Sequence, residues 1–164
     1  MRFMNERLFQ NIIQALIHSA HDVFQTMIFM DIQPKEPFDR KGLNCLSDIT
    51  GVISLTGSVV GSIILSMDAQ FARKAVSNML GDQIESEQEV VDGVGEITNM
   101  VVGMAKTELS NLSCDFEISV PVMIVGKGST IKHLSLEGSS LTTIPFMADG
   151  QTIFHLELYA KDTP

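Results

Sequence analysis

Asp92, Glu96 and Asn99 are the residues of this chain whose types and spacing could support chemistry. They occupy positions i, i+4 and i+7, so at about 100° per residue their side chains fall on one stripe of an α-helix. The opposite stripe is apolar and consists of Val90, Val94, Ile97, Val101 and Met104. The pattern predicts a helix that buries one face and presents a carboxylate and a carboxamide, one turn apart, on the other.

Two glycines, Gly95 and Gly103, lie near this polar stripe. A glycine inside a helix costs about 1 kcal/mol relative to alanine. Two of them on one face suggest that something approaches the helix backbone closely. The alternative is a plain solvated face, because acidic and amide side chains often serve only that purpose on a helix. The spacing alone does not decide between the two.

The composition favours one domain, residues 1–164, with a sizeable core. Hydrophobic residues make up 45% of the chain and the formal net charge is −9. An acidic chain without a basic run is a poor candidate for binding nucleic acid or an anionic membrane surface. No apolar run approaches the ~18 residues of a membrane span. Cys45 and Cys114 are isolated in sequence, which makes a reducing cytoplasm the default location.

Hydrophobic periodicity predicts alternating element types along the first part of the chain. Residues 5–27 have apolar positions at spacing four after the potential cap Asn5. The predicted elements that follow are a loop or short extended piece around Pro34 and Pro37, a hairpin at 51–67 with Gly57 and Gly61 around its turn, a short helix at 69–80 between Asp68 and Gly81, an acidic lead at 82–89, and the long helix to about residue 112.

The remainder of the chain is rich in strand-forming residues. The predicted strands are 116–120, 122–125, 131–136, 141–146 and 153–159. Pro145 makes the fourth of these an edge strand or a weaker prediction. In the last strand, apolar residues alternate with His155 and Glu157, as in a strand that is buried on one face only.

Other candidate sites have little support. His18 and His21 have a spacing that can hold a metal, with Asp22 beside them, but no neighbouring residue completes a ligand shell. His133 and His155 fit sheet faces better than a site. The chain lacks a nucleophile elbow, a Walker-type loop and a dinucleotide loop. We therefore expect no metal or cofactor held by this chain itself.

The motif Asp92-x₃-Glu96-x₂-Asn99, followed after twenty-one residues by Pro121, resembles the signature of the CheC/CheX/FliY family of response-regulator phosphatases. The hairpin and the short helix that ends at Gly81 are also similar to that family, so the resemblance covers about residues 5–160. The other Glu-x-x-Asn, Glu108 and Asn111, falls at the end of the same helix. The chain therefore resembles the single-site CheX branch.

The resemblance implies an α+β fold, mainly an antiparallel sheet packed against two long helices and one short helix. It also implies hydrolysis of the aspartyl-phosphate on a CheY-type receiver domain, with Mg²⁺ held by the receiver. Asn99 would position the attacking water, since a carboxamide both donates and accepts without titrating near neutral pH. Glu96 would pair with a lysine of the receiver. Asp92, Gly95, Gly103 and Pro121 would belong to the partner-binding surface.

Two alternatives remain open from the sequence. The chain could be a module that binds a receiver or a flagellar switch component without catalysis, or a small-ligand sensor that uses the sheet–helix interface. The presence of both Glu96 and Asn99 favours the enzyme. We further expect a homodimer joined through sheet edges, because exposed edges need a partner or protection and because CheX-type members imply one.

Overall fold

The computed structural model describes residues 4–42, 44–132, 136 and 141–163. Within them, eight strands form one antiparallel sheet in the order β1–β7–β8–β4–β3–β5, with β2 also paired to β7 and β6 to β3. The elements are α1 (Glu6–Val23), η1 (Phe24–Ile28), β1 (Gln33–Pro34), β2 (Phe38–Arg40), β3 (Ile49–Gly57), β4 (Val59–Met67), α2 (Ala69–Leu80), α3 (Glu87–Ser110), β5 (Phe116–Ile118), β6 (Val122–Val125), β7 (Leu141–Ala148) and β8 (Gln151–Asp162).

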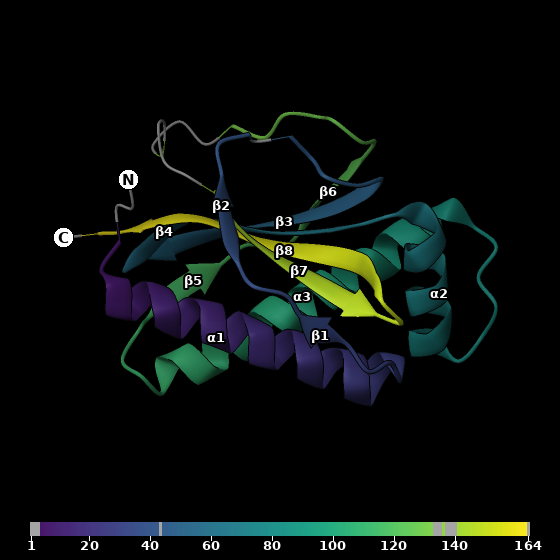
Figure 1. Cartoon of the computed structure of the whole chain (residues 1–164), viewed down its shortest axis with the longest axis horizontal. Helices are drawn as coiled ribbons and strands as arrows, with labels where there is room; N and C mark the ends of the chain where they lie inside the picture. Colours follow the sequence, from purple (N-terminus) through teal and green to yellow (C-terminus); the bar gives the residue numbers. More distant parts are fainter. Residues whose placement is uncertain (1–3, 43, 133–135, 137–140, 164) are drawn as a thin grey trace.

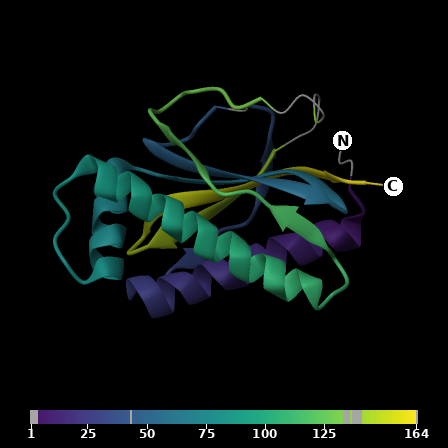
Figure 2. The ribbon, with the colours of Figure 1, turned by 180° about the vertical axis from the view of Figure 1, so that it is seen from behind.

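The helices α1 and α3 lie together on one side of the sheet, and α2 stands at one end of the molecule (Figure 1). Seen from behind, α3 crosses in front of the sheet from α2 towards β5 (Figure 2). The expected α+β fold, with two long helices and one short helix on an antiparallel sheet, is confirmed. The ends of the chain meet, since the backbone N–H of Asn5 donates to Asp162 Oδ2 at 3.0 Å.

Local signals in the sequence explain where the helices begin and end. The Asn5 side chain accepts from the backbone of the first turn of α1, and Asp68 accepts from Phe71 N at 2.7 Å at the start of α2. Gly81 closes α2 in the left-handed conformation, with φ of 69°. The predicted helix at 5–27 has a π-helical last turn, η1.

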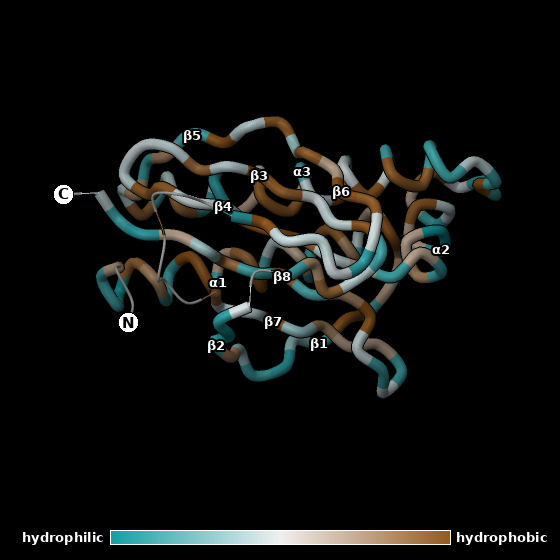
Figure 3. Tube along the Cα trace, turned by 90° about the horizontal axis from the view of Figure 1, so that it is seen from above, coloured by the Kyte–Doolittle hydropathy of each residue, from teal (hydrophilic) through white to brown (hydrophobic). Residues whose placement is uncertain are grey.

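The main core fills the space between the sheet and the helices. Phe24, Phe146 and Phe154 are fully or almost fully buried there, and the Phe154 ring stacks on each of the other two at a centroid distance of 4.6 Å. Hydrophobic residues are spread along the strands and the helices that cover them, whereas hydrophilic residues gather in loops (Figure 3). This packing makes α3 a rigid platform for its exposed face.

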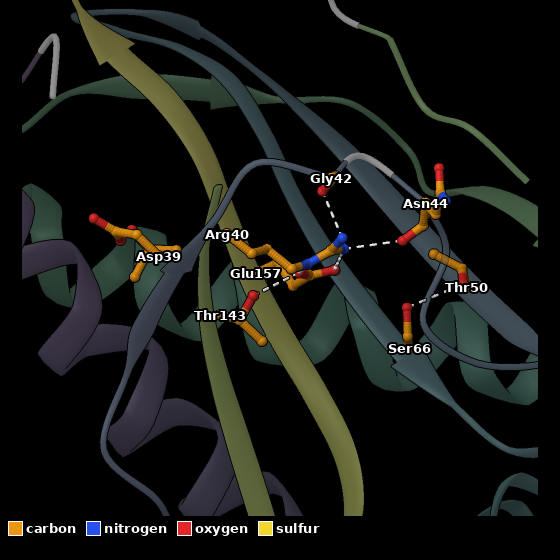
Figure 4. Close-up of polar contacts among 9 residues, drawn as sticks. Asp39, Arg40, Gly42, Asn44, Thr50, Ser66, Thr143 and Glu157 are labelled. Atoms are coloured by element: carbon orange, nitrogen blue, oxygen red, sulfur yellow. Dashed lines mark hydrogen bonds and ion pairs between the residues drawn. The ribbon is translucent and has the colours of Figure 1, made fainter. Parts of the chain in front are cut away.

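On the opposite face of the sheet, the Arg40 side chain at the end of β2 and the segment after it reach over β8 (Figure 4). Arg40 donates to both carboxylate oxygens of Glu157, at 2.8 and 3.0 Å, and to the carbonyl oxygen of Asn44 at 2.9 Å. Thr143 Oγ1 donates to the same carboxylate at 2.7 Å. Glu157 is only 1% exposed. The alternation in β8 therefore gives the wrong environment for this residue, which is buried under the Arg40 side chain and not in solvent.

The strand β7 is longer than predicted, and β8 flanks it on one side while β1 and β2 share the other. The prediction of an edge strand was wrong. Pro145 falls between the residues of β7 that pair with β1 and those that pair with β2, where its missing N–H removes no ladder bond. Its carbonyl still accepts from Lys35 N at 2.8 Å.

The predicted strand at 131–136 is not confirmed. Residues 131 and 132 belong to no strand, and His133 lies outside the described residues together with 134 and 135. The other predicted strands correspond to β5, β6, β7 and β8, and the predicted hairpin is β3 and β4.

Candidate functional site

The polar stripe of α3 faces solvent. Asp92, Glu96 and Asn99 are all exposed, while Val94, Ile97 and Val101 on the opposite face are completely buried. Ser86 caps the start of the helix, where its hydroxyl accepts from Glu89 N at 3.4 Å, and acidic residues in the first turn suit the positive end of the helix dipole. A carboxylate and a carboxamide therefore stand one turn apart on a supported helix, where a second protein could reach both.

Pro121 lies beside this stripe, although it is distant in sequence. A side-chain Cβ at Gly95 would be 3.9 Å from Pro121 Cγ and 3.2 Å from Met123 Sδ. Gly95 itself is buried. The close approach that the sequence predicted at this glycine is thus made by the chain's own β6 rather than by an outside partner. The missing side chain allows β6 and Pro121 to lie against α3.

Gly103 stays a candidate for the partner-binding surface, whereas Met104 departs from its predicted place on the apolar stripe. Gly103 is partly exposed, and a Cβ there would meet no atom within 4 Å, so the space beside it is open. Met104 was placed on the core stripe by the sequence, but it is 42% exposed. The neighbouring Val102 and Ala105 are buried instead. The stripe drifts because the helix packs against β3 and β6 on one side and against α1 on another.

The second Glu-x-x-Asn does not form a similar arrangement. α3 ends at Ser110, so Asn111 is its C-cap, and Glu108 Oε1 lies 3.2 Å from His18 Nδ1 on α1. His21 lies within 4.0 Å of carboxylates from Asp22 and Asp31. In the described part of the chain, no group of three His, Cys, Asp or Glu side chains could hold a metal ion.

Exposed apolar residues of the segment around Pro121 were not predicted as a surface feature. Val120, Val122 and Val125 are 81%, 62% and 67% exposed. The apolar run on both sides of Pro121 was visible in sequence, but it was assigned to ordinary strands. Only the pairing of β6 with β3 shows which side chains of this run face α3.

Among the described helices, none is both long enough and apolar enough to span a membrane.

The chain is similar to known chemotaxis proteins in sequence and in fold. The family model described as chemotaxis phosphatase CheX matches residues 49–147. A CheX structure from Desulfovibrio desulfuricans is 31% identical, with a TM-score of 0.80 over 93% of this chain and 99% of that one. The CheY-P phosphatase CheX of Thermotoga maritima is 24% identical over 152 residues, covering 92% of this chain and 96% of its own.

A third relative was solved as a complex. The structure described as the CheX–CheY–BeF₃–Mg²⁺ complex from Borrelia burgdorferi has a TM-score of 0.73 and 24% identity, over 92% of this chain and 98% of that one. The fold is thus the one shared by CheX-type chemotaxis proteins. This chain belongs to the CheX family of chemotaxis phosphatases.

Proposed function

We propose that this chain hydrolyses the aspartyl-phosphate of a CheY-type response regulator, with Asn99 and Glu96 as its working residues. The observation that carries the proposal is the exposure of both side chains on one stripe of α3, in a chain of the CheX family. A relative named as a CheY-P phosphatase and one solved with CheY support the choice of substrate.

Asn99 is proposed to hold the attacking water. Its amide oxygen accepts a hydrogen bond from that water, while its amide nitrogen can donate to an oxygen of the phosphoryl group. The water oxygen forms a bond to phosphorus as the bond to the aspartate oxygen breaks. The products are inorganic phosphate and the free carboxylate, with no oxidant or reductant involved. Phosphoryl transfer needs mainly such positioning and charge stabilisation.

Glu96 is proposed to anchor the receiver by pairing with a lysine near its phosphoryl group. Because Glu96 and Asn99 are one turn apart, an ion pair at Glu96 would fix the register in which Asn99 approaches the phosphorus. Asp92, Pro121 and Gly103 are proposed to contact the receiver around this pair. Gly95 is buried and would not touch the receiver; its missing side chain allows Pro121 to lie beside the stripe. Any Mg²⁺ would belong to the receiver, and this chain would hold none.

Phosphate release from a phosphorylated CheY-type receiver, with and without this protein, tests the proposal. We expect catalytic amounts of the chain to accelerate release. Tight binding of the phosphorylated receiver without faster release would instead support the non-catalytic binding module.

Equilibrium dialysis of the isolated chain against Mg²⁺ and Zn²⁺ tests the metal prediction, and stoichiometric binding of either ion would contradict it.

We also propose a homodimer joined through sheet edges, located in the cytoplasm. The described sheet ends in short strands on both sides, β1 and β2 on β7 and β5 and β6 on β3, which leaves backbone groups at its margins. Light scattering at micromolar concentration is expected to show twice the mass of the chain. A monomer of 18.0 kDa at all concentrations would contradict the dimer.

A further inference from the structure

A cavity of about 280 Å³ opens at the start of α3, where the helix meets α2 and β6. Its apolar lining comes from Ile49, Val90, Val91 and Val125, and its polar lining includes Glu87 and Gln88. Val125 is 67% exposed although it stands beside two almost fully buried residues, Ile49 and Val90. The described chain thus leaves an apolar side chain uncovered at the entrance of a partly formed pocket.

This cavity is continuous with the proposed docking stripe. Gln88 Nε2 donates to Asp92 Oδ1 at 2.8 Å, which joins the edge of the cavity to the first residue of the stripe. Glu96 is eight positions after Gln88, about 12 Å along a helix. A typical interface covers roughly 800 Å² on each partner, a patch roughly 30 Å across. A receiver centred on Glu96 and Asn99 would therefore also cover the cavity.

The register of β6 determines which valines face the cavity. Met123 pairs with Gly51, and a Cβ at Gly51 would contact Thr98 of α3. The alternate residues of β6 that share the face of Met123 therefore point towards the helix. Val125 pairs with Ile49 and belongs to the same set. Val122 pairs with Val52 and so faces the opposite side of the sheet. One strand therefore carries two valines of similar exposure, of which one lines the cavity.

The charged groups around the cavity restrict what could fill it. Arg73 and Asp48 bring one positive and one negative charge to the lining, and each is also hydrogen-bonded to the backbone, Arg73 to the carbonyl of Ile84 at 2.5 Å and Asp48 to Ala69 N at 2.9 Å. Glu87 adds exposed negative charge to the lining, and the exposed Asp92 adds negative charge on the stripe, next to Gln88. An apolar side chain that has a basic residue as its neighbour would match this lining.

We infer that this cavity receives one apolar side chain of the CheY-type receiver, next to a basic residue of that receiver, and that Val125 determines how tightly the substrate docks. The inference rests on the proposed function and adds a second contact outside the Glu96–Asn99 pair. The cavity contributes to binding in the ground state and the transition state alike, so its loss changes the substrate concentration needed for half-maximal rate and not the rate at saturation.

Val125→Lys tests this inference, with Val122→Lys and Leu80→Lys as controls at exposed apolar positions outside the cavity. We expect Val125→Lys to raise the half-saturating concentration of the phosphorylated receiver about tenfold, because it loses apolar burial and repels the basic neighbour. Turnover at saturation should stay within about twofold. Val125→Ile should behave like the wild type, and both controls should leave the half-saturating concentration unchanged.

The outcomes separate this inference from the proposed function. If the wild type is active and Val125→Lys has an unchanged half-saturating concentration, the cavity is not a docking site, whereas the phosphatase proposal stands. A change in oligomeric state for Val125→Lys alone, seen by light scattering, would assign the cavity to a second copy of this chain and overturn the inference. If the wild type is inactive, titration with the receiver loaded with beryllofluoride and Mg²⁺ replaces the rate measurement. Absence of binding there would overturn both proposals.

Discussion

The Asn99 side chain is exposed, while the opposite face of the same helix is anchored in the core. Ile97 and Val101 on that opposite face are completely buried, while Asn99 faces solvent. Anchoring limits the movement of the backbone that carries the carboxamide. Because positioning is the main contribution of a phosphoryl-transfer catalyst, a fixed carboxamide suits the proposed reaction better than one on a mobile loop.

Asn99→Ala should reduce the rate of receiver dephosphorylation at saturation about 10²-fold, which corresponds to about 2.7 kcal/mol of transition-state stabilisation. The half-saturating concentration should change little. Because the side chain is exposed, the free energy of unfolding should fall by no more than about 0.5 kcal/mol. Steady-state kinetics and thermal melts check both parts, with Asn111→Ala as the control on the same helix. Full activity of Asn99→Ala would refute the proposed mechanism, and inactivity caused by unfolding would make Asn99 structural.

Glu96→Ala should weaken docking as well as slow turnover, since it removes one partner of the proposed intermolecular ion pair. We expect the half-saturating concentration to rise and its dependence on salt to become shallower. Kinetics at two ionic strengths measure both effects. Glu36→Ala, an exposed carboxylate in the loop between β1 and β2, is the control. An unchanged salt dependence would show that Glu96 makes no such pair.

At the scale of elements, two short strands determine the surroundings of the longer ones. β6 brings Pro121 to the side of α3, and Gly95 provides the room for this contact. β2 carries Arg40 over the outer face of the sheet, where it reaches Glu157 on β8 (Figure 4). Each strand has three or four residues and depends on side-chain contacts to hold its place.

Arg40→Ala should destabilise the fold by about 3 kcal/mol, or roughly 6–12 °C in Tm, because it leaves the Glu157 carboxylate buried and unpaired. The double variant Arg40→Ala, Glu157→Gln should recover part of this loss, since it removes the buried charge. Denaturant and thermal unfolding measure both variants. Lys41→Ala, at the exposed neighbouring position, is the control. Equal stability of Arg40→Ala and the wild type would show that the pair contributes nothing.

At the scale of the whole molecule, His155 is expected to make folding stability depend on pH. Burial lowers the pKa of His155 below its ordinary value of 6.5; the nearby Glu157 raises the pKa and Arg40 lowers it. Its Nδ1 atom is buried without a hydrogen-bond partner among the described residues. The folded state therefore disfavours the protonated imidazole more than the unfolded state does.

The direction in which folding stability changes with pH follows from proton binding at His155. Below about pH 6.5 the unfolded chain binds a proton at His155 that the folded chain resists, so stability falls as pH decreases from about 6.5 towards the lowered folded pKa. Melting temperatures between pH 7.5 and 5.5 should decline, and His155→Gln should flatten this part of the curve. His18→Gln, at an exposed site, serves as the control. An identical pH profile for His155→Gln would contradict the prediction.

Sequence by itself determined the elements whose signals are local. The caps Asn5 and Asp68, the left-handed Gly81 and the period of α3 depend on neighbours within a turn or two, so the helices and the exposed Asp92–Glu96–Asn99 stripe could be predicted. The resemblance of the motif to a family added the expectation of a mainly antiparallel sheet packed against two long helices and one short helix. Family membership and the α+β fold were predicted correctly on this basis.

Only the tertiary structure decided the features that depend on long-range pairing. The burial of Glu157, the place of Pro145 between two short strands and the packing of Gly95 under Met123 all depend on residues far away in sequence. The exposure of Met104 was missed because helix periodicity gives the direction of a side chain but not what lies beside it. The cavity at Val125 is of the same kind, because register with β3 alone turns that side chain towards α3.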